Sequence, residues 1–426
     1  MKRCLITCFI FLVFVTSNNA QVWEKITPTF DPSGIYNNYL GDFINRYVGW
    51  SVSQYGRIWH TQDGGLTWEM QKDSNRVSIN DIEFVDSLCG WISGLTFSDE
   101  IPFLWRTTNS GNSWEYIEIP DTAIAGPFVI YFYDSLKGFA GGWNNAFYYT
   151  KNGGKDWEDI TNGEILFGAL YDIFFIDSLL GWAVGESGEA IDVGVIINTI
   201  DGGRSWQIQL PETLILKAVY FSNNKHGCAV GSNVWWEGVI LVTNDGGENW
   251  QDMYFPCSWL NDVVFIDDST GWVVGDYGFI WYTDDGGQTW TQVESGTDVD
   301  LNRIVFVDDG SIGYIFGEDN TLLKHNNNDN SIKDYISPPL QFSLSQNYPN
   351  PFNAITTIGY VLPQNSNVRL SIYDITGRLL ETLVDQSQII GYYQVGWNAS
   401  IYSSGVYIYK IQTDEFQQIK KMLLIK

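Results

Sequence analysis

Apolar and polar residues alternate over short stretches along most of the chain. The segment NDIEFVD at residues 80–86 alternates in this way, and GWISG at 90–94, FLWRT at 103–107 and WEYIEI at 114–119 follow it. Period-two alternation between turns rich in Gly, Asn and Asp is typical of β-strands. No amphipathic helical pattern of useful length competes with it. This segment therefore predicts four consecutive strands.

The four-strand unit recurs along the chain. One marker is the motif TDDGGQTW at residues 283–290, which has five further copies, at residues 61–68, 107–114, 150–157, 199–206 and 243–250. A second marker is a glycine followed by a mostly aromatic residue, and it occurs seven times, at Gly49, Gly90, Gly138, Gly181, Gly227, Gly271 and Gly313. The spacings between these glycines are 41, 48, 43, 46, 44 and 42 residues. That period is the length of a four-stranded propeller blade, so the chain is predicted to be all-β with a seven-bladed β-propeller.

The seventh unit is incomplete at its C-terminal end. It has GYIFG at residues 313–317 and TLLKH at 321–325, but NNNDNS replaces the motif and the fourth strand. The segment VWEKIT at residues 22–27 matches the fourth strands of other units, such as SWEYI. We expect this N-terminal strand to complete the seventh blade and close the ring, because closure removes exposed sheet edges. The propeller is expected to span residues 21–330.

The repeat resembles a known family. The segment at residues 260–290, which ends in TDDGGQTW, is similar to the repeat of the photosystem II assembly and stability factor propellers. TDDGGQTW itself resembles the wider Asp-box, or BNR-type, repeats of bacterial sialidases, and we call it the Asp box. The resemblance covers about residues 22–330 and implies the fold. It does not imply one activity, because Asp-box propellers serve many roles.

The last part of the chain follows a different pattern. Residues 331–341 are expected to form a linker stiffened by Pro338 and Pro339, and the short alternating strands of residues 342–426 predict a small Ig-like β-sandwich. The motifs NYPNPFN, IYDITGR, SGVYIYK and a terminal KKMLLIK resemble the type A C-terminal sorting domain of the type IX secretion system. The residues that represent these motifs are Asn347, Pro349, Pro351, Phe352, Gly377, Gly405, Lys420 and Lys421.

The second resemblance implies an export route. It implies that the type IX machinery is a partner and carries the protein through the outer membrane after Sec export, with the tail removed and the protein released or attached at the surface. Residues 1–20 agree with this route, since Lys2 and Arg3 precede an apolar run at residues 5–15, which is typical of a signal peptide cleaved near Ala20. No later stretch reaches the length of a membrane span, so we expect none in the mature chain.

Charge and cysteine content exclude some partners. The formal net charge is −27, and the negative excess lies in residues 21–330, because residues 331–426 hold seven basic and six acidic side chains. Such a surface repels nucleic acid, so no nucleic-acid partner is expected. Cys89, Cys228 and Cys257 have no spacing typical of a disulfide framework or a metal site, and no metal or cofactor is predicted.

The Asp boxes are predicted to be structural turns. Their two glycines allow a tight connection with positive φ, and the Asp or Asn side chain can accept backbone hydrogen bonds across it. Asn at two of the six positions could cap such a turn but not act as an acid or nucleophile. The capping residues are Asp63, Asn109, Asn152, Asp201, Asp245 and Asp285. The box tryptophans, which begin the outer strands, are Trp68, Trp114, Trp157, Trp206, Trp250 and Trp290.

Loop lengths predict where a ligand would bind. The turns between first and second strands and the Asp boxes lie at one end of each blade and are uniform, whereas the connections at the other end vary in length. Binding loops on a rigid scaffold are expected at that variable end. The candidates there are Trp235, Trp236, Glu237, Phe97, Glu100 and Glu186. The two tryptophans could stack on a sugar or anchor a protein partner, or one could fold back onto its blade, and the carboxylates could simply be solvated.

Together these features favour a secreted or cell-surface propeller that acts as a non-catalytic binding or scaffold module for an extracellular protein or glycan. No catalytic residue is assigned. The alternative is an extracellular glycoside hydrolase, sialidase-like or xyloglucanase-like, that uses carboxylates on the face opposite the Asp boxes. A sialidase requires an arginine cluster, but residues 21–330 hold only six arginines, and Arg204 lies inside an Asp box at the wrong end, so binding is the leading hypothesis.

Overall fold

The structure is a computed structural model. It describes residues 22–26, 38–53, 55–74, 76–98, 101–117, 127–143, 146–160, 167–187, 194–212, 214–255, 259–326, 342–344, 346–347, 350–364, 366–388 and 391–426. Within these residues the fold is all-β, and the only helical segment is a single 3-10 turn at Asp276–Gly278. None of the described residues form a helix long and apolar enough to cross a membrane.

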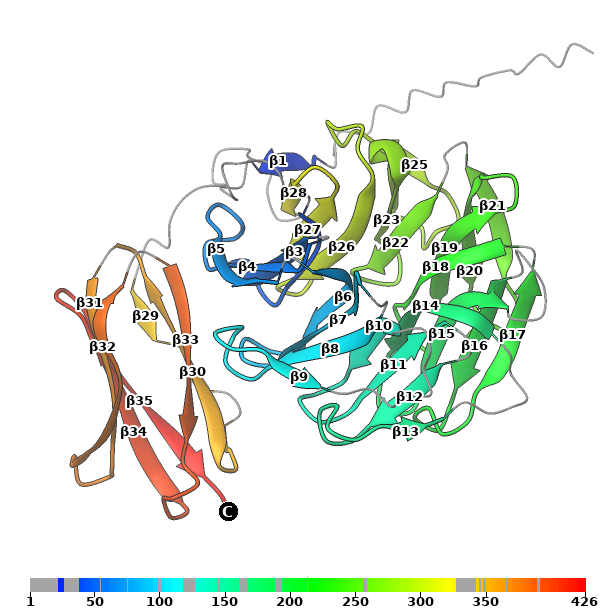
Figure 1. Ribbon diagram of the computed structural model, residues 1–426. Helices are drawn as coiled ribbons and strands as arrows, with labels where there is room; N and C mark the ends of the chain where they lie inside the picture. The colour runs from blue at the N-terminus through cyan, green and yellow to red at the C-terminus, as the bar shows by residue number, and fades with distance from the viewer. Residues whose placement is uncertain are drawn as a thin grey trace, which may run out of the picture.

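Up to residue 326 the strands form seven antiparallel four-stranded sheets (Figure 1). Sheet 1 contains β2 (Asn38–Phe43), β3 (Gly49–Ser53), β4 (Arg57–Thr61) and β5 (Glu69–Asp73). Sheet 2 contains β6 (Val77–Phe84), β7 (Gly90–Thr96), β8 (Pro102–Thr107) and β9 (Glu115–Ile117). Sheet 3 contains β10 (Pro127–Phe132), β11 (Gly138–Gly142), β12 (Phe147–Thr150) and β13 (Glu158–Asp159). Sheet 4 contains β14 (Phe167–Phe175), β15 (Gly181–Ser187), β16 (Gly194–Thr199) and β17 (Gln207–Glu212).

The remaining three sheets of this region follow the same plan. Sheet 5 contains β18 (Leu214–Phe221), β19 (Gly227–Asn233), β20 (Gly238–Thr243) and β21 (Gln251–Phe255). Sheet 6 contains β22 (Leu260–Phe265), β23 (Gly271–Gly275), β24 (Ile280–Thr283) and β25 (Thr291–Val293). Sheet 7 contains β26 (Leu301–Val307), β27 (Ile312–Gly317), β28 (Thr321–Asn326) and β1 (Glu24–Ile26). Its fourth strand therefore comes from the N-terminal part of the chain, with Glu24 opposite Lys324.

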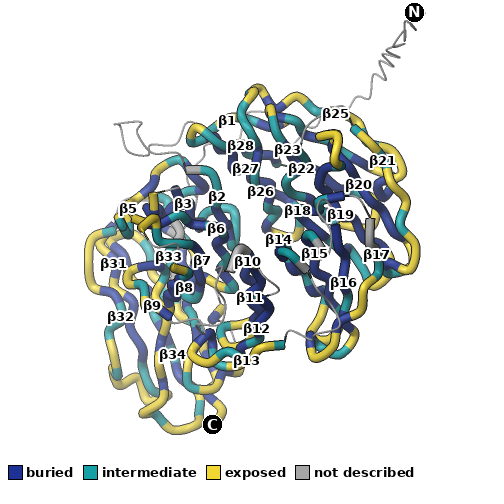
Figure 2. Tube along the Cα trace, turned by 45° about the vertical axis from the view of Figure 1, so that its right-hand side comes forward, coloured by how far each residue is buried: buried dark blue, intermediate teal, exposed yellow. Residues whose placement is uncertain are grey.

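The first strands of successive sheets lie next to one another. β2 contacts β6, and the contacts continue through β10, β14, β18 and β22 to β26. β26 in turn contacts β2. Burial is greatest in the middle strands: β3 and β4 are buried along their whole length, whereas the outer strand β5 has only exposed and half-buried positions (Figure 2). The middle strands are apolar because a neighbouring sheet covers each of their faces.

Stacked aromatic rings connect neighbouring sheets. Except for Cys228, the residue that follows the marker glycine stacks on the last residue, or the next to last, of the first strand of the next sheet. The closest of these stacks, with their ring-centroid separations, are Trp50–Phe84 at 3.5 Å, Trp91–Phe132 at 3.6 Å, Trp182–Phe221 at 3.4 Å and Tyr314–Phe43 at 3.6 Å. The glycine-aromatic marker is therefore the point at which one repeat packs against the next.

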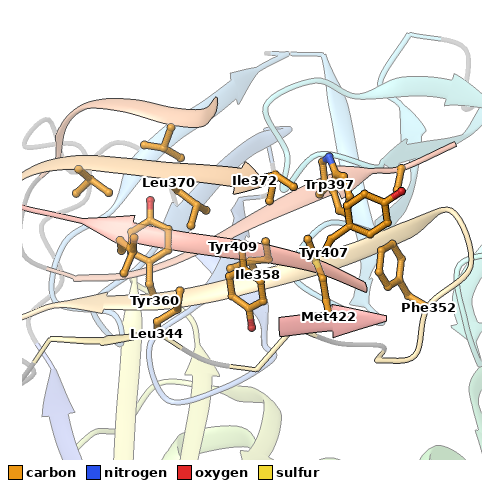
Figure 3. Close-up of a cluster of buried hydrophobic side chains, with 14 of the residues drawn as sticks. Leu344, Phe352, Ile358, Tyr360, Leu370, Ile372, Trp397, Tyr407, Tyr409 and Met422 are labelled. Atoms are coloured by element: carbon orange, nitrogen blue, oxygen red, sulfur yellow. The ribbon is translucent and has the colours of Figure 1, made fainter. Parts of the chain in front are cut away.

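Residues 342–426 form two further sheets with their own core. One contains β29 (Ser343–Leu344), β30 (Ile355–Leu362) and β33 (Gly391–Asn398). The other contains β32 (Leu379–Gln388), β31 (Ser366–Tyr373), β34 (Gly405–Gln412) and β35 (Gln417–Leu424). Figure 3 shows the buried cluster between these strands, with Phe352, Trp397 and Tyr407 packed together at one end. Every buried residue of this cluster comes from this part of the chain.

Candidate functional site

The Asp boxes join the third and fourth strands of six sheets with one hydrogen-bond pattern. In the box at residues 283–290, Asp285 Oδ1 accepts from the Thr283 hydroxyl and from Thr289 N, at 2.9 Å each. Gly287 N donates to Thr283 Oγ1 at 2.9 Å. Gly286 and Gly287 have φ of +73° and +79°, which only glycine adopts without strain. Gly286 N also bonds the Ser269 carbonyl at 2.8 Å, so each box is attached to the neighbouring turn of its own sheet.

The two Asn boxes keep this geometry through a change of partner. Asp201 Oδ2 accepts from the Ser205 hydroxyl at 2.7 Å, whereas Asn152 Nδ2 donates to Asp156 Oδ2 at 2.7 Å. At the position where the Asp carboxylate of one box accepts a hydrogen bond, the Asn amide of the other box donates one to an acceptor. Asn109 uses Ser113 in the same way, at 2.9 Å. The oxygens and amides of the boxes are used within the turn, which supports their predicted structural role.

Buried carboxylates on the first strands connect neighbouring sheets near the axis. Each accepts a backbone N–H of the next sheet. The pairs are Asp42 with Phe84 N at 2.8 Å, Asp81 with Ile130 N at 3.0 Å, Glu83 with Phe132 N at 2.9 Å, Asp172 with Val219 N at 2.8 Å, and Asp262 with Ile304 N at 2.8 Å. Burial raises the pKa of Asp42 and Asp262 to about 6 and that of Asp172 to about 7, and Arg303 opposes the shift in each.

Arg303 is the cation that these carboxylates share. Its Nη1 lies 3.3 Å from Asp81 Oδ1, and its Nε lies 4.0 Å from Asp262 Oδ2. Burial alone would lower the pKa of Arg303, but Asp81 and Asp262 raise it above its ordinary value. Both oxygens of Asp81 and of Asp262 also accept backbone N–H groups. Arg303 and these buried carboxylates therefore hold neighbouring sheets together. The described residues include no group of His, Cys, Asp and Glu side chains placed to hold a metal ion.

The turn that carries Trp235 and Trp236 lies between β19 and β20. Asn233 Oδ1 accepts from Trp235 N at 2.9 Å and Glu237 N at 3.0 Å, and its amide donates to Glu237 Oε2 at 2.9 Å. Trp236 adopts a φ of +64°. These bonds fix the turn while leaving both indoles exposed, at 78% for Trp235 and 66% for Trp236. Glu237 therefore helps to hold the turn in its conformation.

Trp236 belongs to a cluster at the loop end of sheets 4, 5 and 6. Its ring meets the Trp259 ring edge-on at 5.8 Å. Lys217 Nζ lies 5.0 Å from the Trp259 ring centroid and 4.5 Å from that of Tyr171. Tyr171 in turn is hydrogen-bonded to Glu186, and burial raises the pKa of its hydroxyl. Burial lowers the pKa of Lys217, and Glu186 and Asp276 act against that change. We call Tyr171, Glu186, Lys217, Trp236 and Trp259 the loop-face cluster.

Asp276 fixes the edge of this cluster. One of its oxygens accepts from Trp259 N at 3.3 Å, and the other accepts from the Asn261 amide at 3.1 Å. Asn261 also donates to the Leu301 carbonyl at 3.0 Å. The position of the Trp259 indole is therefore set by sheets 6 and 7.

The structure brings only some of the predicted loop residues together. Glu186 and Trp236 belong to the loop-face cluster, and Trp235 lies on the same turn. Phe97 is exposed but contacts Tyr55 of sheet 1, at 5.9 Å between ring centroids. Glu100 lies outside the described residues. Their role as binding residues stays a prediction.

The sorting-motif residues are mostly part of the C-terminal framework. Asn347 is buried. Its backbone N–H donates to the Tyr409 hydroxyl at 2.9 Å, and its side-chain amide donates to Thr356 Oγ1 at 2.9 Å. Phe352 is buried and its N–H bonds the Leu423 carbonyl at 3.0 Å. A cis peptide joins Asn350 to Pro351, and Gly377 has a φ of +84° in a turn closed onto the Asp374 carbonyl. Gly405 begins β34.

The two lysines of the motif lie on the last strand, β35. Lys420 pairs with Tyr409 and Lys421 with Ile408 across the β34–β35 ladder. Lys421 is exposed and Lys420 half-buried, while the alternating Met422 and Leu424 face the core. Pro349 lies outside the described residues. Cys89 and Cys228 are free thiols, and Cys257 also lies outside the described residues.

The sequence reasoning missed Tyr171, Lys217 and Trp259. Tyr171 and Lys217 occupy regular first strands, where the alternating pattern gives no functional signal. One signal was available. Lys217 interrupts the apolar segment LILKAVYF at a position where the matching strands carry Tyr, Asn or Phe. Recognising it requires alignment of the seven first strands with one another.

The fold places the chain in the class of all-β proteins built from Asp-box-type four-stranded sheets, with a separate C-terminal β unit. Residues 256–326 match the family described as photosynthesis system II assembly factor YCF48, and residues 346–426 match the secretion system C-terminal sorting domain. Both resemblances predicted from the sequence are thereby confirmed. The sorting domain indicates type IX export to the cell surface or the medium and interaction with that secretion machinery.

Solved structures share the fold. YCF48 bound to D1 peptide has a TM-score of 0.56 and 23% identity, over 72% of this chain and 97% of that chain. YCF48 from Cyanidioschyzon merolae has a TM-score of 0.55 and 19% identity, over 72% and 99%. The GH74 xyloglucanase from Xanthomonas campestris has a TM-score of 0.52 and 12% identity, over 80% of this chain and 60% of that chain. No curated protein sequence matches the chain. At these identities the likeness concerns the fold alone.

Proposed function

We propose that the protein is an exported, non-catalytic binding module that holds a segment of an extracellular protein on the face carrying Trp235 and Trp236. The observation that carries this proposal is the exposure of two adjacent indoles on a turn fixed by Asn233. Exposed tryptophan is costly in water, and at an interface it is among the residues that contribute most to affinity. A rigid turn adds little ordering cost on binding.

The scaffold of this face is a closed seven-bladed propeller of residues 21–330. The pairing of β1 with β28 and the contact of β26 with β2 support closure. Residues 342–426 form the Ig-like sandwich of this proposal. The linker proposed at residues 331–341 and the cleaved signal peptide proposed at residues 1–20 lie outside the described residues. The separate core of the last two sheets supports this division.

The kind of ligand follows from the loop-face cluster. Trp236 and Trp259 offer apolar rings, and Lys217 offers a positive charge between Glu186 and Asp276. Such a surface fits a peptide with an apolar anchor and both charge signs. A relative with this fold, YCF48, is known in complex with D1 peptide, which supports a peptide as the ligand class.

Peptide arrays and glycan arrays, both probed with the secreted chain, test this proposal. Peptide ligands found in this way should bind the Trp235→Ala/Trp236→Ala variant about 30-fold more weakly, since hot-spot losses reach 2 kcal/mol or more. The matched control is Tyr116→Ala, because Tyr116 is 56% exposed on β9 of sheet 2. The proposal is contradicted if the Trp235→Ala/Trp236→Ala variant and the Tyr116→Ala variant bind the peptide with equal affinity, or if the protein binds glycans alone.

The glycoside hydrolase is the second candidate, favoured by the GH74 likeness in fold. It requires two opposed carboxylates on this face. Glu186 is hydrogen-bonded to Tyr171 and both oxygens of Asp276 are occupied, which disfavours them as an acid and base pair. Turnover of a xyloglucan or sialoglycan that is lost in Glu186→Gln would establish the hydrolase in place of the binding module.

A further inference from the structure

A cavity of about 610 Å³ opens at the Asp-box end of the molecule, between sheets 3 and 4. Its walls are the turn at residues 133–137, the turn at residues 178–179, the outer strand of sheet 3, and parts of two Asp boxes. This is the opposite end from the loop-face cluster, and the volume lies within the range of small-ligand sites.

The cavity exists because one repeat carries smaller side chains than its neighbour. At the junction of sheets 2 and 3, Trp91 Nε1 donates to the Gly153 carbonyl at 3.2 Å. Arg106 lies over the Trp91 ring at 5.7 Å and donates to the Ser135 carbonyl at 3.2 Å. Those two side chains fill the space under the next Asp box.

At the junction of sheets 3 and 4, Phe139 and Tyr149 occupy the same repeat positions. Phe139 follows Gly138 as Trp91 follows Gly90, and Tyr149 precedes Thr150 as Arg106 precedes Thr107. Phe139 stacks on Phe175 at 4.9 Å, more loosely than Trp91 on Phe132 at 3.6 Å. Ser178 and Gly202, the counterparts of Ser135 and Gly153, line the cavity.

Three cations and three acids line this space, and the acids are Asp134, Glu158 and Asp201. The cations, which make the fewer contacts, are Lys137, Lys151 and Arg204. No ion pair joins these side chains to other described residues. Two of the neighbouring acids accept hydrogen bonds within their own turns. Asp134 Oδ1 accepts from Leu136 N and Lys137 N, and Asp201 accepts from Ser205. The three cationic groups are therefore not committed to an ion pair with these acids.

The rest of the lining offers hydroxyls and apolar surface. The Tyr133 hydroxyl is buried with no hydrogen-bond partner among the described residues, so it needs a partner from outside them. Tyr149 lies beside it, and Ile160 and Leu179 supply apolar surface. Glu158 adds an acceptor.

We propose that this cavity binds an anionic saccharide of two or three rings that carries carboxylate or sulfate groups. The cations would pair with the anionic groups, Tyr133 and Glu158 with ring hydroxyls, and Ile160 and Leu179 with the apolar face of a ring. The three cations are too few to hold nucleic acid against the negative field of the whole surface. This site is independent of the proposed peptide-binding face.

Calorimetric titration of the secreted chain tests the assignment. The probes are a heparin tetrasaccharide, trigalacturonate and neutral cellotriose, with an acidic hexapeptide as a fourth. We expect a Kd of about 1 mM or tighter for at least one of the two anionic saccharides, weakened by added salt, and no measurable binding of cellotriose.

The variants locate the site. Arg204→Ala and Lys137→Ala should each weaken binding by about tenfold, the value of a charge-assisted hydrogen bond. Lys155→Ala is the matched control, because Lys155 occupies the position of Arg204 in the previous Asp box, beside the filled junction, and it should leave binding unchanged. Phe139→Trp should fill the cavity and abolish binding.

The proposal is overturned if neither anionic saccharide binds, if cellotriose or the hexapeptide binds as well as they do, or if Lys155→Ala matches Arg204→Ala. Should Phe139→Trp fail to fold, as judged by its circular dichroism, the two cation variants still decide the question. Peptide binding at the loop face is measured separately, so either proposal can fail without the other.

Discussion

The junction of sheets 2 and 3 and the junction of sheets 3 and 4 share a backbone plan but differ in what fills them. Trp91 and Arg106 close the first, and Phe139 and Tyr149 leave a cavity in the second. Contacts between neighbouring first strands are present at both junctions and hold the sheets at their spacing, so the sheets do not close up around a smaller side chain. Two side-chain changes in one repeat can therefore leave space for a site.

The two junctions also differ near the axis. Asp81 and Glu83 of sheet 2 accept N–H groups of sheet 3, at Ile130 and Phe132. The same positions in sheet 3 are Val129 and Tyr131, and only the Tyr131 hydroxyl reaches sheet 4, at the Phe175 carbonyl 3.2 Å away. The first junction is thus both better filled and more polar than the second.

The largest expected effect is on the filled junction. Trp91→Ala should lower the free energy of unfolding by about 3–5 kcal/mol, because Trp91 is fully buried and its loss leaves a large void. Phe139→Ala should cost less, because the phenyl ring is smaller than the indole and stacks more loosely on the next sheet. Urea unfolding of both variants measures the difference. A greater loss in Phe139→Ala would contradict the account of the two junctions.

The polar contact at the first junction should make stability depend on pH. Burial, together with Asp81 and Asp42, raises the pKa of Glu83 well above its ordinary value. The folded state then holds this proton more tightly than the unfolded state, so the contribution of Glu83 to stability is greatest at low pH and is lost as the pH rises above about 4.

Glu83→Gln keeps an acceptor for Phe132 N and removes this titration. We expect it to flatten the decline of unfolding free energy between pH 4 and 7, by about 1.4 kcal/mol for each unit of pKa shift removed. Tyr131→Phe, at the equivalent position of the second junction, should leave the slope unchanged. An unaltered slope in Glu83→Gln would show that this carboxyl does not titrate as inferred.

A smaller effect distinguishes the Asp boxes at the two junctions. Asn152→Asp should destabilise sheet 3 by about 0.5–1 kcal/mol, because Asn152 donates to Asp156 and a second carboxylate would repel it. Adding Asp156→Ser reproduces the Asp201–Ser205 pair of sheet 4 and should restore stability. Thermal unfolding of the single and double variants checks the pairing, which fails if the second change restores nothing.

The smallest effect is expected for the cations of the cavity. Lys137→Ala should change the unfolding free energy by no more than about 0.5 kcal/mol, since its side chain makes no ion pair among the described residues. Arg106→Met, which removes the bond to Ser135, should cost more. Chemical unfolding compares the two, and a large loss in Lys137→Ala would mean that the cations serve stability.

Much of the fold was predictable because it repeats. Alternation located the strands, and the return of Gly-aromatic and Asp-box markers gave the number and order of the four-stranded sheets. VWEKIT indicated that β1 comes from the N-terminal end, and β1 does pair with β28. The sorting motifs identified the C-terminal unit, where the family match agrees.

The sites were less predictable. Trp235 and Trp236 were found because an insertion marks them, but Tyr171, Lys217 and Trp259 were not, because their contacts span three sheets. The variation in loop length predicted a ligand site at the end opposite the Asp boxes, whereas the cavity lies at the Asp-box end. The Asp-box turns have the same length in each repeat, so their length gives no sign that Phe139 replaces the larger Trp91 beneath one of them.

By itself, the sequence determined strand order, the register of the repeat, the turn chemistry of the Asp boxes and the export tag. These depend on residues close together in the chain, where φ preference, alternation and side-chain capping act directly. Only the tertiary structure decided that Lys217 lies between two aromatic rings and that Phe139 leaves a cavity where Trp91 fills one. Those outcomes depend on which side chains of separate sheets meet, and on a rigid backbone that keeps unfilled space open.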